Sequence, residues 1–272
     1  MDKPKVLFIS QEITPYLPAT AMSTLSVKLP QSMQERGFEV RTFMPKYGCI
    51  NERRNQLHEV IRLSGMNLII DDTDHPLIIK VATLQPARMQ VYFIDNDDYF
   101  RRSGASDIEI RQLPEDNDER SIFFVRGVVE TVKKLRWEAA VVHCSGWISA
   151  LAPIYIKKNY GDDPSFSASK VVYSLQDDRF DGTLDARFVE KLMMDNLLAE
   201  DLKALTESGD GVDYEALTRL AIDHADAIVQ ASDNVSDSIL QYAKASGKPM
   251  LHHTGDEDYA DAYAEFYRSL LQ

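Results

Sequence analysis

The segment over residues 5–36 has the layout of a phosphate-binding site but lacks the residue types that such a site requires. It consists of a short apolar run, a loop and a stretch with helical spacing. Phosphate binding in this arrangement needs glycines, because backbone N–H groups must approach the anion near the helix N-terminus. The loop Thr14–Met22 contains no glycine and no lysine. We therefore expect no ordinary dinucleotide or nucleotide-sugar phosphate binding here, which also disfavours an unrelated nucleotide-binding protein.

Two groups of residues have the composition of a metal site without its geometry. They are His252 and His253 with the carboxylates of residues 256–258, and the aspartates Asp177, Asp178 and Asp181. Adjacent side chains in an extended segment point to opposite faces, so the two histidines do not converge on one ion. The aspartates have no other type of ligand beside them, and we expect them in a solvated loop at the carboxyl edge of a sheet. The sequence thus predicts no metal site and no cofactor.

His143 and the two cysteines, Cys49 and Cys144, lie among apolar or small residues. At the end of a buried strand, a structural histidine bonded to the backbone is expected rather than a catalytic base. Neither cysteine belongs to a C-x-x-C pair, so we expect two reduced and largely buried thiols. No G-x-S-x-G motif indicates Ser-His-Asp catalysis. The residues alone leave the catalytic groups unknown.

The elements that must position these residues alternate apolar strands with amphipathic helices. Lys5–Ser10, a helix over 21–36 and Glu39–Met44 form a βαβ unit. Short, partly alternating runs over 57–94 favour an antiparallel hairpin insertion. Helices then follow at 118–135, 147–158, 187–205, 214–224 and 232–245, with strands at 139–144, 170–175 and 226–230. The sequence predicts one doubly wound, mostly parallel, Rossmann-like α/β domain over 1–272.

The end of the chain, residues 256–272, carries a predicted amphipathic helix over 259–271. Its apolar residues are unusually aromatic, which is not typical of a free tail. The helix either packs on the domain, over the surface that a second domain would occupy, or forms a partner interface. Packing is the expectation.

Composition excludes several classes of partner. A chain of 272 residues with 44% apolar residues can bury a substantial core. A formal charge of −13 repels phosphate backbones, so neither nucleic acid nor anionic membrane is an expected partner. No apolar run approaches the roughly 20 residues that cross a bilayer, and Val6–Ile9 is too short for a signal peptide. We expect a cytoplasmic protein.

Several stretches, in the right order over residues 3–243, resemble the N-terminal catalytic domain of bacterial, ADP-glucose-dependent glycogen and starch synthases. They are Lys5–Tyr16, Leu29-Pro30, Arg36–Gly48, Tyr92–Arg101, Asp116–Phe124, Trp137–Cys144, Trp147, Ala150–Lys157, and His224–Val229 with Ser232. The resemblance implies one half of a GT-B-type glycosyltransferase, whose donor substrate would be ADP-glucose. It places Asp116, Asn117, Arg120 and His143 near a sugar-binding cleft.

This chain departs from the family pattern where the resemblance implies chemistry. The family's K-x-G-G-L loop, which holds the sugar nucleotide, is Pro18–Met22 here, and the aspartate that follows it in the family is Thr24. The family's H-D-W reads Ser145-Gly146-Trp147, and its later His-Asn reads Gln176-Asp177. Family members also continue into a second Rossmann domain with most of the nucleotide contacts, and this chain ends at Gln272.

Two interpretations of the remaining candidates stay open. Asp116 and Asn117 could bind sugar hydroxyls, or Asp116, Asn117 or Asp118 could cap the helix, which is the expectation. Trp147, Tyr155 and Tyr173 could line a sugar platform, although core packing is expected.

The sequence favours a glycogen-synthase-like domain that is non-catalytic alone, with a regulatory, scaffolding or glucan-binding role. Its partners would be glucan, a protein of glycogen metabolism or further copies of itself. The alternative is an active glycogen synthase, or half of one completed by another chain.

Overall fold

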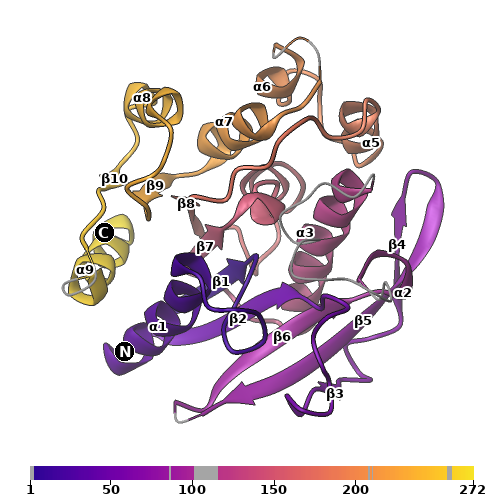
Figure 1. Ribbon diagram of the computed structural model, residues 1–272, viewed down its shortest axis with the longest axis vertical. Coiled ribbons are helices and arrows are strands. Elements are labelled where there is room, and N and C mark those ends of the chain that lie inside the picture. Colours follow the sequence, from indigo (N-terminus) through magenta and orange to yellow (C-terminus); the bar gives the residue numbers. More distant parts are fainter. Residues whose placement is uncertain (1–2, 86, 101–115, 208, 210, 256–258) are drawn as a thin grey trace.

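The fold is organised around a continuous ten-stranded β-sheet (Figure 1). The computed structural model describes residues 3–85, 87–100, 116–207, 209, 211–255 and 259–272. The strand order is β10-β9-β8-β7-β1-β2-β6-β5-β3, and β4 pairs with β5 outside this path. The strands are β1 (Lys5–Ser10), β2 (Glu39–Pro45), β3 (His58–Glu59), β4 (Met66–Ile70), β5 (Thr73–Leu84), β6 (Met89–Asp95), β7 (Val141–Ser145), β8 (Lys170–Leu175), β9 (Ala227–Gln230) and β10 (Met250–Leu251).

Every neighbouring pair from β10 to β6 is parallel, which confirms the predicted doubly wound α/β fold. In the centre, Val6 of β1 is paired with Val40 of β2 and Val141 of β7. All residues of β7 are buried, as is usual for parallel strands that are covered on both faces. The carboxyl ends of β1, β7, β8 and β9 therefore meet at one edge of the sheet.

Helices cover both faces of this sheet (Figure 1). Right-handed crossovers place α1 (Ala21–Glu35) on one face and the helices that follow β6, β7, β8 and β9 on the other. α9 (Tyr259–Leu270) contacts α1 and so shares its face. The other helices are α2 (Asp97–Phe100), α3 (Asn117–Lys134), α4 (Ala152–Ile154), α5 (Phe188–Met194), α6 (Lys203–Thr206), α7 (Tyr214–His224) and α8 (Asp237–Ala245).

The insertion predicted over 57–94 is antiparallel in β3, β4 and β5, but its last strand belongs to the main sheet. β6 is antiparallel to β5 and parallel to β2, where Thr42 is paired with Val91. The hairpin is thus an extension of the sheet through β5 rather than a separate unit.

Three predicted helices are shorter or differently wound than expected. The segment 147–158 consists of a 3₁₀ helix at Trp147–Ser149, the short α4 and a π-helix at Tyr155–Asn159. The segment 187–205 contains α5 and α6 with a non-helical stretch between them, and α8 begins at Asp237 rather than at 232. In the first case, the cause is tertiary: the carboxylate of Asp178 binds the backbone N–H of Trp147 and fixes the start of the segment.

The hydrophobic core includes the three aromatic residues that could have lined a sugar platform. Trp147, Tyr155 and Tyr173 are at most 3% exposed, so they are core residues, as expected. Cys144 is also buried, whereas the prediction of a buried Cys49 was wrong, because that residue lies in an exposed turn after β2.

The terminal helix α9 packs on the domain, as expected. Tyr263 and Tyr267 are buried, and the hydroxyl of Tyr267 is hydrogen-bonded to Nδ1 of His143 at 2.8 Å. Arg36 at the end of α1 binds Asp261 at 2.7 Å. No helix within the described part of the chain is long and apolar enough to cross a membrane.

Candidate sugar-binding site

Two cavities, each of about 430 Å³, meet at the N-terminal end of α1, where the parallel strands end. The first lies between the loop after β1 and the loop after β8, and Glu12, Gln176 and Asp178 line it. The second lies between α1, the end of β9 and α9. Thr20 and Ala21 line both cavities. In α/β proteins, ligands usually bind at the carboxyl ends of the parallel strands, at the point where the strand order reverses.

The N-terminus of α1 is already occupied by side chains of its own loop. Thr20 caps the helix by accepting a hydrogen bond from the N–H of Ser23 at 2.9 Å, and Ser23 bonds back to the N–H of Thr20 at 2.8 Å. The Thr20 hydroxyl in turn donates to the carboxylate of Glu12, which is 5% exposed. A capping box consumes N–H groups that a phosphate would otherwise bind. The capping box therefore engages the N–H groups of Thr20 and Ser23 within the loop and helix themselves.

Asp178 is a structural carboxylate, so its prediction as part of a solvated loop was wrong. It is half-buried and accepts hydrogen bonds from the N–H of Trp147 at 2.6 Å and the hydroxyl of Tyr214 at 2.8 Å. Burial raises the pKa of Asp178 to about 6, against the lowering effect of these hydrogen bonds and with a further increase from Glu12. Asp178 thus ties the ends of β7 and β8 to α7 while it lines the first cavity.

Asp116, Asn117 and Arg120 lie together at the start of α3, but the expected helix cap is absent. The backbone of Asp116 has φ −106° and ψ 18° rather than the extended conformation of a good N-cap, and its side chain makes no capping hydrogen bond. Arg120 donates to Oδ1 of Asn117 at 2.8 Å and stacks its guanidinium over Phe100. Asn117 and Arg120 are at most 3% exposed.

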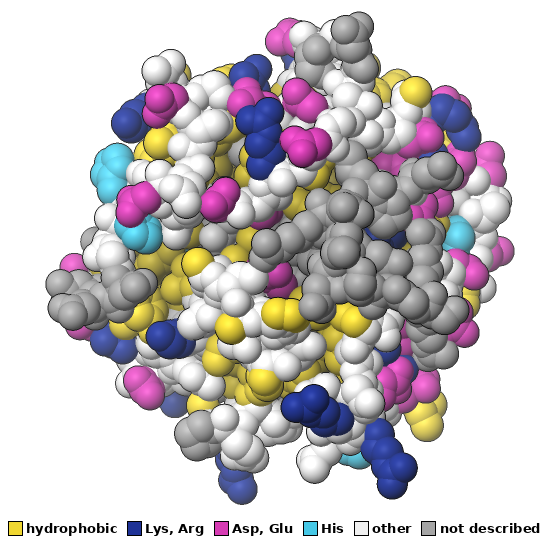
Figure 2. Space-filling view, in the orientation of Figure 1, with side chains coloured by type: hydrophobic (Ala, Val, Ile, Leu, Met, Phe, Trp, Pro, Cys, Tyr) yellow, Lys and Arg dark blue, Asp and Glu magenta, His cyan; other side chains and the backbone are white. Residues whose placement is uncertain are grey.

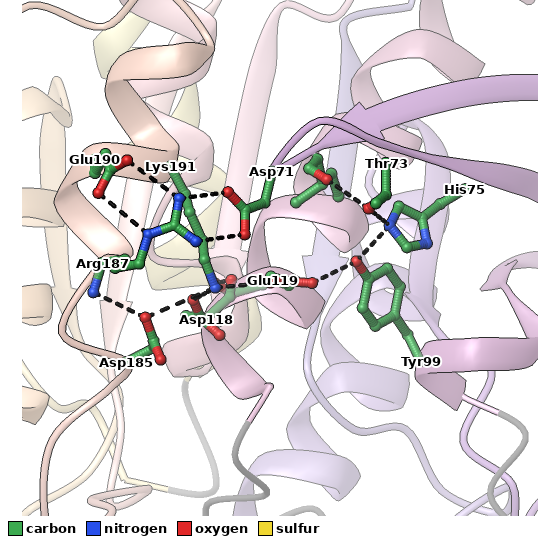
Figure 3. Close-up of polar contacts among 12 residues, drawn as sticks. Asp71, Thr73, His75, Tyr99, Asp118, Glu119, Asp185, Arg187, Glu190 and Lys191 are labelled. Carbon is green, nitrogen blue, oxygen red and sulfur yellow. Dashed lines mark hydrogen bonds and ion pairs between the residues drawn. The ribbon is translucent and has the colours of Figure 1, made fainter.

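Asp118 and Glu119 both bind Lys191 of α5 (Figure 3). The Nζ atom of Lys191 lies 2.7 Å from each carboxylate. Burial raises the pKa of Asp118, and Lys191 only partly offsets this effect. Burial opposes the charge of Lys191, but its hydrogen bonds to Asp118 and Glu119 outweigh burial and raise its pKa.

The same network continues to the β4–β5 hairpin (Figure 3). Glu119 accepts a hydrogen bond from Tyr99 at 2.8 Å, and the Tyr99 hydroxyl lies 3.0 Å from Nε2 of His75. On the other side, Arg187 binds both oxygens of Asp71. The start of α3 is therefore joined by polar contacts to α2, α5 and the hairpin.

His143 lies apart from these residues, in the sheet beneath α9. It is 3% exposed, with Nε2 2.9 Å from the Ser174 hydroxyl and Nδ1 2.8 Å from that of Tyr267. Burial lowers the pKa of His143 to about 3, so the ring is neutral at physiological pH. Its partners are side chains rather than the expected backbone, and both ring nitrogens are engaged, so it does not reach either cavity.

The structure thus brings together three of the four candidates, Asp116, Asn117 and Arg120, at the start of α3 and separates them from His143. None of the four lines either cavity within the described residues. Of the residues that line the first cavity, the sequence did not single out Glu12, and it considered Asp178 only as part of a possible metal group and Thr20 only as part of the first loop. The position of Glu12 and Thr20 around the first loop was a usable signal, because the helix N-terminus lies there. Among the described residues, no cluster of three metal-ligating side chains is present, and the carboxylates of residues 256–258, which were considered beside His252 and His253, lie outside the described residues.

Comparison with known proteins identifies the family. A family model described as the starch synthase catalytic domain matches residues 5–253. The glycogen synthases of Chlorobium limicola and Chlorobaculum tepidum are 33% and 35% identical to this chain over 237 residues, which is 87% of this chain and 47% of each relative.

A solved structure agrees on the fold. The catalytic domain of starch synthase IV from Arabidopsis thaliana, bound to ADP and acarbose, superposes with a TM-score of 0.74 at 16% identity, over 92% of this chain and 51% of that one. The chain spans about half the length of these relatives. It belongs to the starch synthase catalytic domain family.

Proposed function

We propose that this chain is a glycogen-synthase-type domain that binds glucan and does not by itself transfer glucose from ADP-glucose. The observation that carries the proposal is the loop at the N-terminus of α1. The family pattern has a lysine and paired glycines there, and this chain has Pro18, Thr20 and Ala21. Thr20 is engaged with Glu12 and Ser23, so the loop presents hydroxyl and carboxylate groups instead of a cation and open backbone.

The charge of the first cavity supports the same conclusion. Glu12, Asp177 and Asp178 line it, and Arg179 is the only basic residue among its described lining residues. A diphosphate brings further negative charge next to these carboxylates, in surroundings where partial burial strengthens the repulsion. The donor ADP-glucose is therefore a poor ligand for this cavity.

A neutral sugar meets no such repulsion. Carboxylate oxygens accept hydrogen bonds from hydroxyl groups, and the amides of Gln11, Gln176 and Asn234 both donate and accept at the same cavity. A site built from these groups can bind a polyhydroxylated, uncharged chain. On this proposal the protein acts in the cytoplasm in a regulatory, scaffolding or glucan-binding role in glycogen metabolism, with glucan or a glycogen-metabolism protein as its partner.

Calorimetric titration of the full chain with ADP-glucose, ADP and maltooligosaccharides tests the proposal. We expect heat of binding from the oligosaccharides and none from either nucleotide at millimolar concentration. A radiolabelled ADP-glucose transfer assay with glycogen as acceptor should show no incorporation. Tight ADP-glucose binding would contradict the proposal and favour the second candidate, half of an active synthase completed by another chain, which the half-length match to the relatives also allows.

A further inference from the structure

The second cavity, between α1 and α9, differs from the first in its chemistry. Its lining includes the hydroxyl groups of Thr20 and Thr24, the amide of Gln230, and the aromatic side chains of Tyr259 and Tyr263. Its described lining contains no carboxylate, and its basic residues are Lys28 and His253. Apolar walls with a few converging polar groups are typical of small-ligand pockets, whose volumes are about 300–1,000 Å³.

We propose that this second cavity binds glucose units of the same glucan chain that occupies the first, so that the chain crosses the N-terminal end of α1. This inference rests on the proposed function, because it names where the glucan binds. Thr20 and Ala21 belong to the lining of both cavities, so the two cavities adjoin at the N-terminal end of α1. A single sugar unit would use one cavity, and a longer oligosaccharide would use both.

The tyrosine pair supplies the apolar part of the recognition. The rings of Tyr259 and Tyr263 are 6.5 Å apart between centroids and nearly perpendicular, at 78°. Tyr263 is 3% exposed and lies behind the half-buried ring of Tyr259, so Tyr259 offers the apolar surface, which suits the C–H face of a sugar ring. Thr24 and Gln230, on the opposite elements, supply hydrogen-bonding groups.

The wall formed by α9 is fixed in place before any ligand binds. The hydroxyl of Tyr259 is 3.2 Å from that of Ser32, and Arg268 donates to the backbone carbonyl of Arg36 at 3.0 Å. The buried hydrogen bond between Tyr267 and His143 anchors the C-terminal half of the helix. A pocket with fixed walls loses little conformational entropy on binding, so the ligand meets a preformed surface.

The test compares maltoheptaose and maltotriose binding to the full chain by calorimetry. Thr24→Phe fills the second cavity from an accessible helix position, and Gln230→Ala removes a hydrogen-bonding group without adding bulk. Glu35→Phe is the matched control, because it adds the same ring at an exposed position of α1 outside the cavity lining. We expect Thr24→Phe to weaken maltoheptaose binding by about fivefold or more and maltotriose binding by less, since the shorter sugar can use the first cavity alone.

Two results would overturn the inference, and they differ from each other. If maltoheptaose affinity is unchanged in folded Thr24→Phe and Gln230→Ala variants, the second cavity does not bind the glucan, although the proposed function stands. If the wild-type chain binds no maltooligosaccharide at all, the proposed function fails and this inference fails with it. Circular dichroism of each variant establishes that it is folded.

Discussion

Asp178 and His143 are titratable residues in the same sheet region, and burial moves their pKa values in opposite directions. Burial penalises the charged form of each group, so the pKa of the Asp178 carboxyl rises to about 6 and that of the His143 imidazole falls to about 3. Asp178 takes up a proton on folding in mildly acidic solution, whereas His143 loses one. The two residues therefore contribute opposite slopes to the pH dependence of stability.

We expect Asp178→Asn to remove one of these slopes. The pKa of Asp178 is about 6 in the folded protein and has the ordinary value of 3.8 in the unfolded chain, so its contribution to stability is largest below about pH 4 and falls as pH rises to 6. The free energy of unfolding of the wild type, minus that of the variant, should fall by at most about 1.4 kcal/mol per pH unit over this range. Urea unfolding at several pH values measures this difference. Asp177→Asn, at an exposed neighbour, is the control.

Lys191→Met should destabilise the protein strongly. The side chain of Asp118 is fully buried and that of Lys191 is 6% exposed, so the substitution leaves a buried carboxylate without its cation. Breaking a buried ion pair in this way costs about 3–5 kcal/mol. Arg187→Gln, which breaks an exposed pair with Asp71, should cost far less. Equal losses for the two variants in urea unfolding would show that Asp118 does not depend on Lys191.

Helices and strands with strong periodicity could be predicted from the sequence, and those shaped by distant contacts could not. α3 and β1 follow their local pattern closely. The helical pieces after β7 do not, because Trp147 is bound by Asp178, a residue 31 positions later in the chain. The candidate site shows the same limit: the sequence placed Asn117 and Arg120 together, but the network around Lys191 depends on α5, which no local pattern connects to α3.

The chain should bind ADP-glucose more tightly when Pro18, Thr20 and Ala21 of the first loop are replaced by the residues of the family pattern. The variant P18K/T20G/A21G supplies a cation and open backbone at the N-terminus of α1, which are the groups that bind phosphate. The matched control P18Q/T20G/A21G has the glycines without the charge. We expect the lysine variant to bind ADP-glucose about tenfold more tightly than the control. Equal affinities in calorimetry would mean that the lysine at this position does not limit nucleotide binding.

The packing of α9 on the domain should be stabilised by one buried hydrogen bond, between Tyr267 and His143. Tyr267→Phe keeps the ring but removes the hydroxyl that binds His143, and a buried polar atom left without its partner costs about 1–3 kcal/mol. Tyr259→Phe is the control, because its hydroxyl lies at a half-buried position near Ser32. Thermal unfolding should show the larger loss for Tyr267→Phe. A similar loss of thermal stability in both variants would show that the buried Tyr267–His143 hydrogen bond contributes no more than the half-buried contact of Tyr259.

The described residues from the hairpin to the terminal helix share one hydrophobic core, which is what the predicted single domain requires. The core includes Leu68 and Leu77 of the hairpin, Val6 of the central strand and Tyr267 of the terminal helix. Because the hairpin extends the main sheet and contributes to the same core, it should not unfold alone.

We therefore expect a single urea transition, with the same midpoint by two methods. Trp137 and Trp147 are both buried, so their fluorescence reports the core, and far-ultraviolet circular dichroism reports the helices and strands. Coincident midpoints are the mark of one cooperative unit. A first transition seen by circular dichroism alone would show that part of the chain unfolds independently and would contradict a single domain.

The two end strands of the sheet, β10 and β3, are each only two residues long. An edge strand of this length offers few backbone groups to a strand from another molecule, and edge-to-edge pairing is the step that starts fibre growth. The longest strand, β5, is covered by β6 on one side and by β3 and β4 over much of the other. Among the described strands, the five-residue β4 pairs with β5 alone, so strand pairing between two molecules is expected at β4 rather than at β10 or β3.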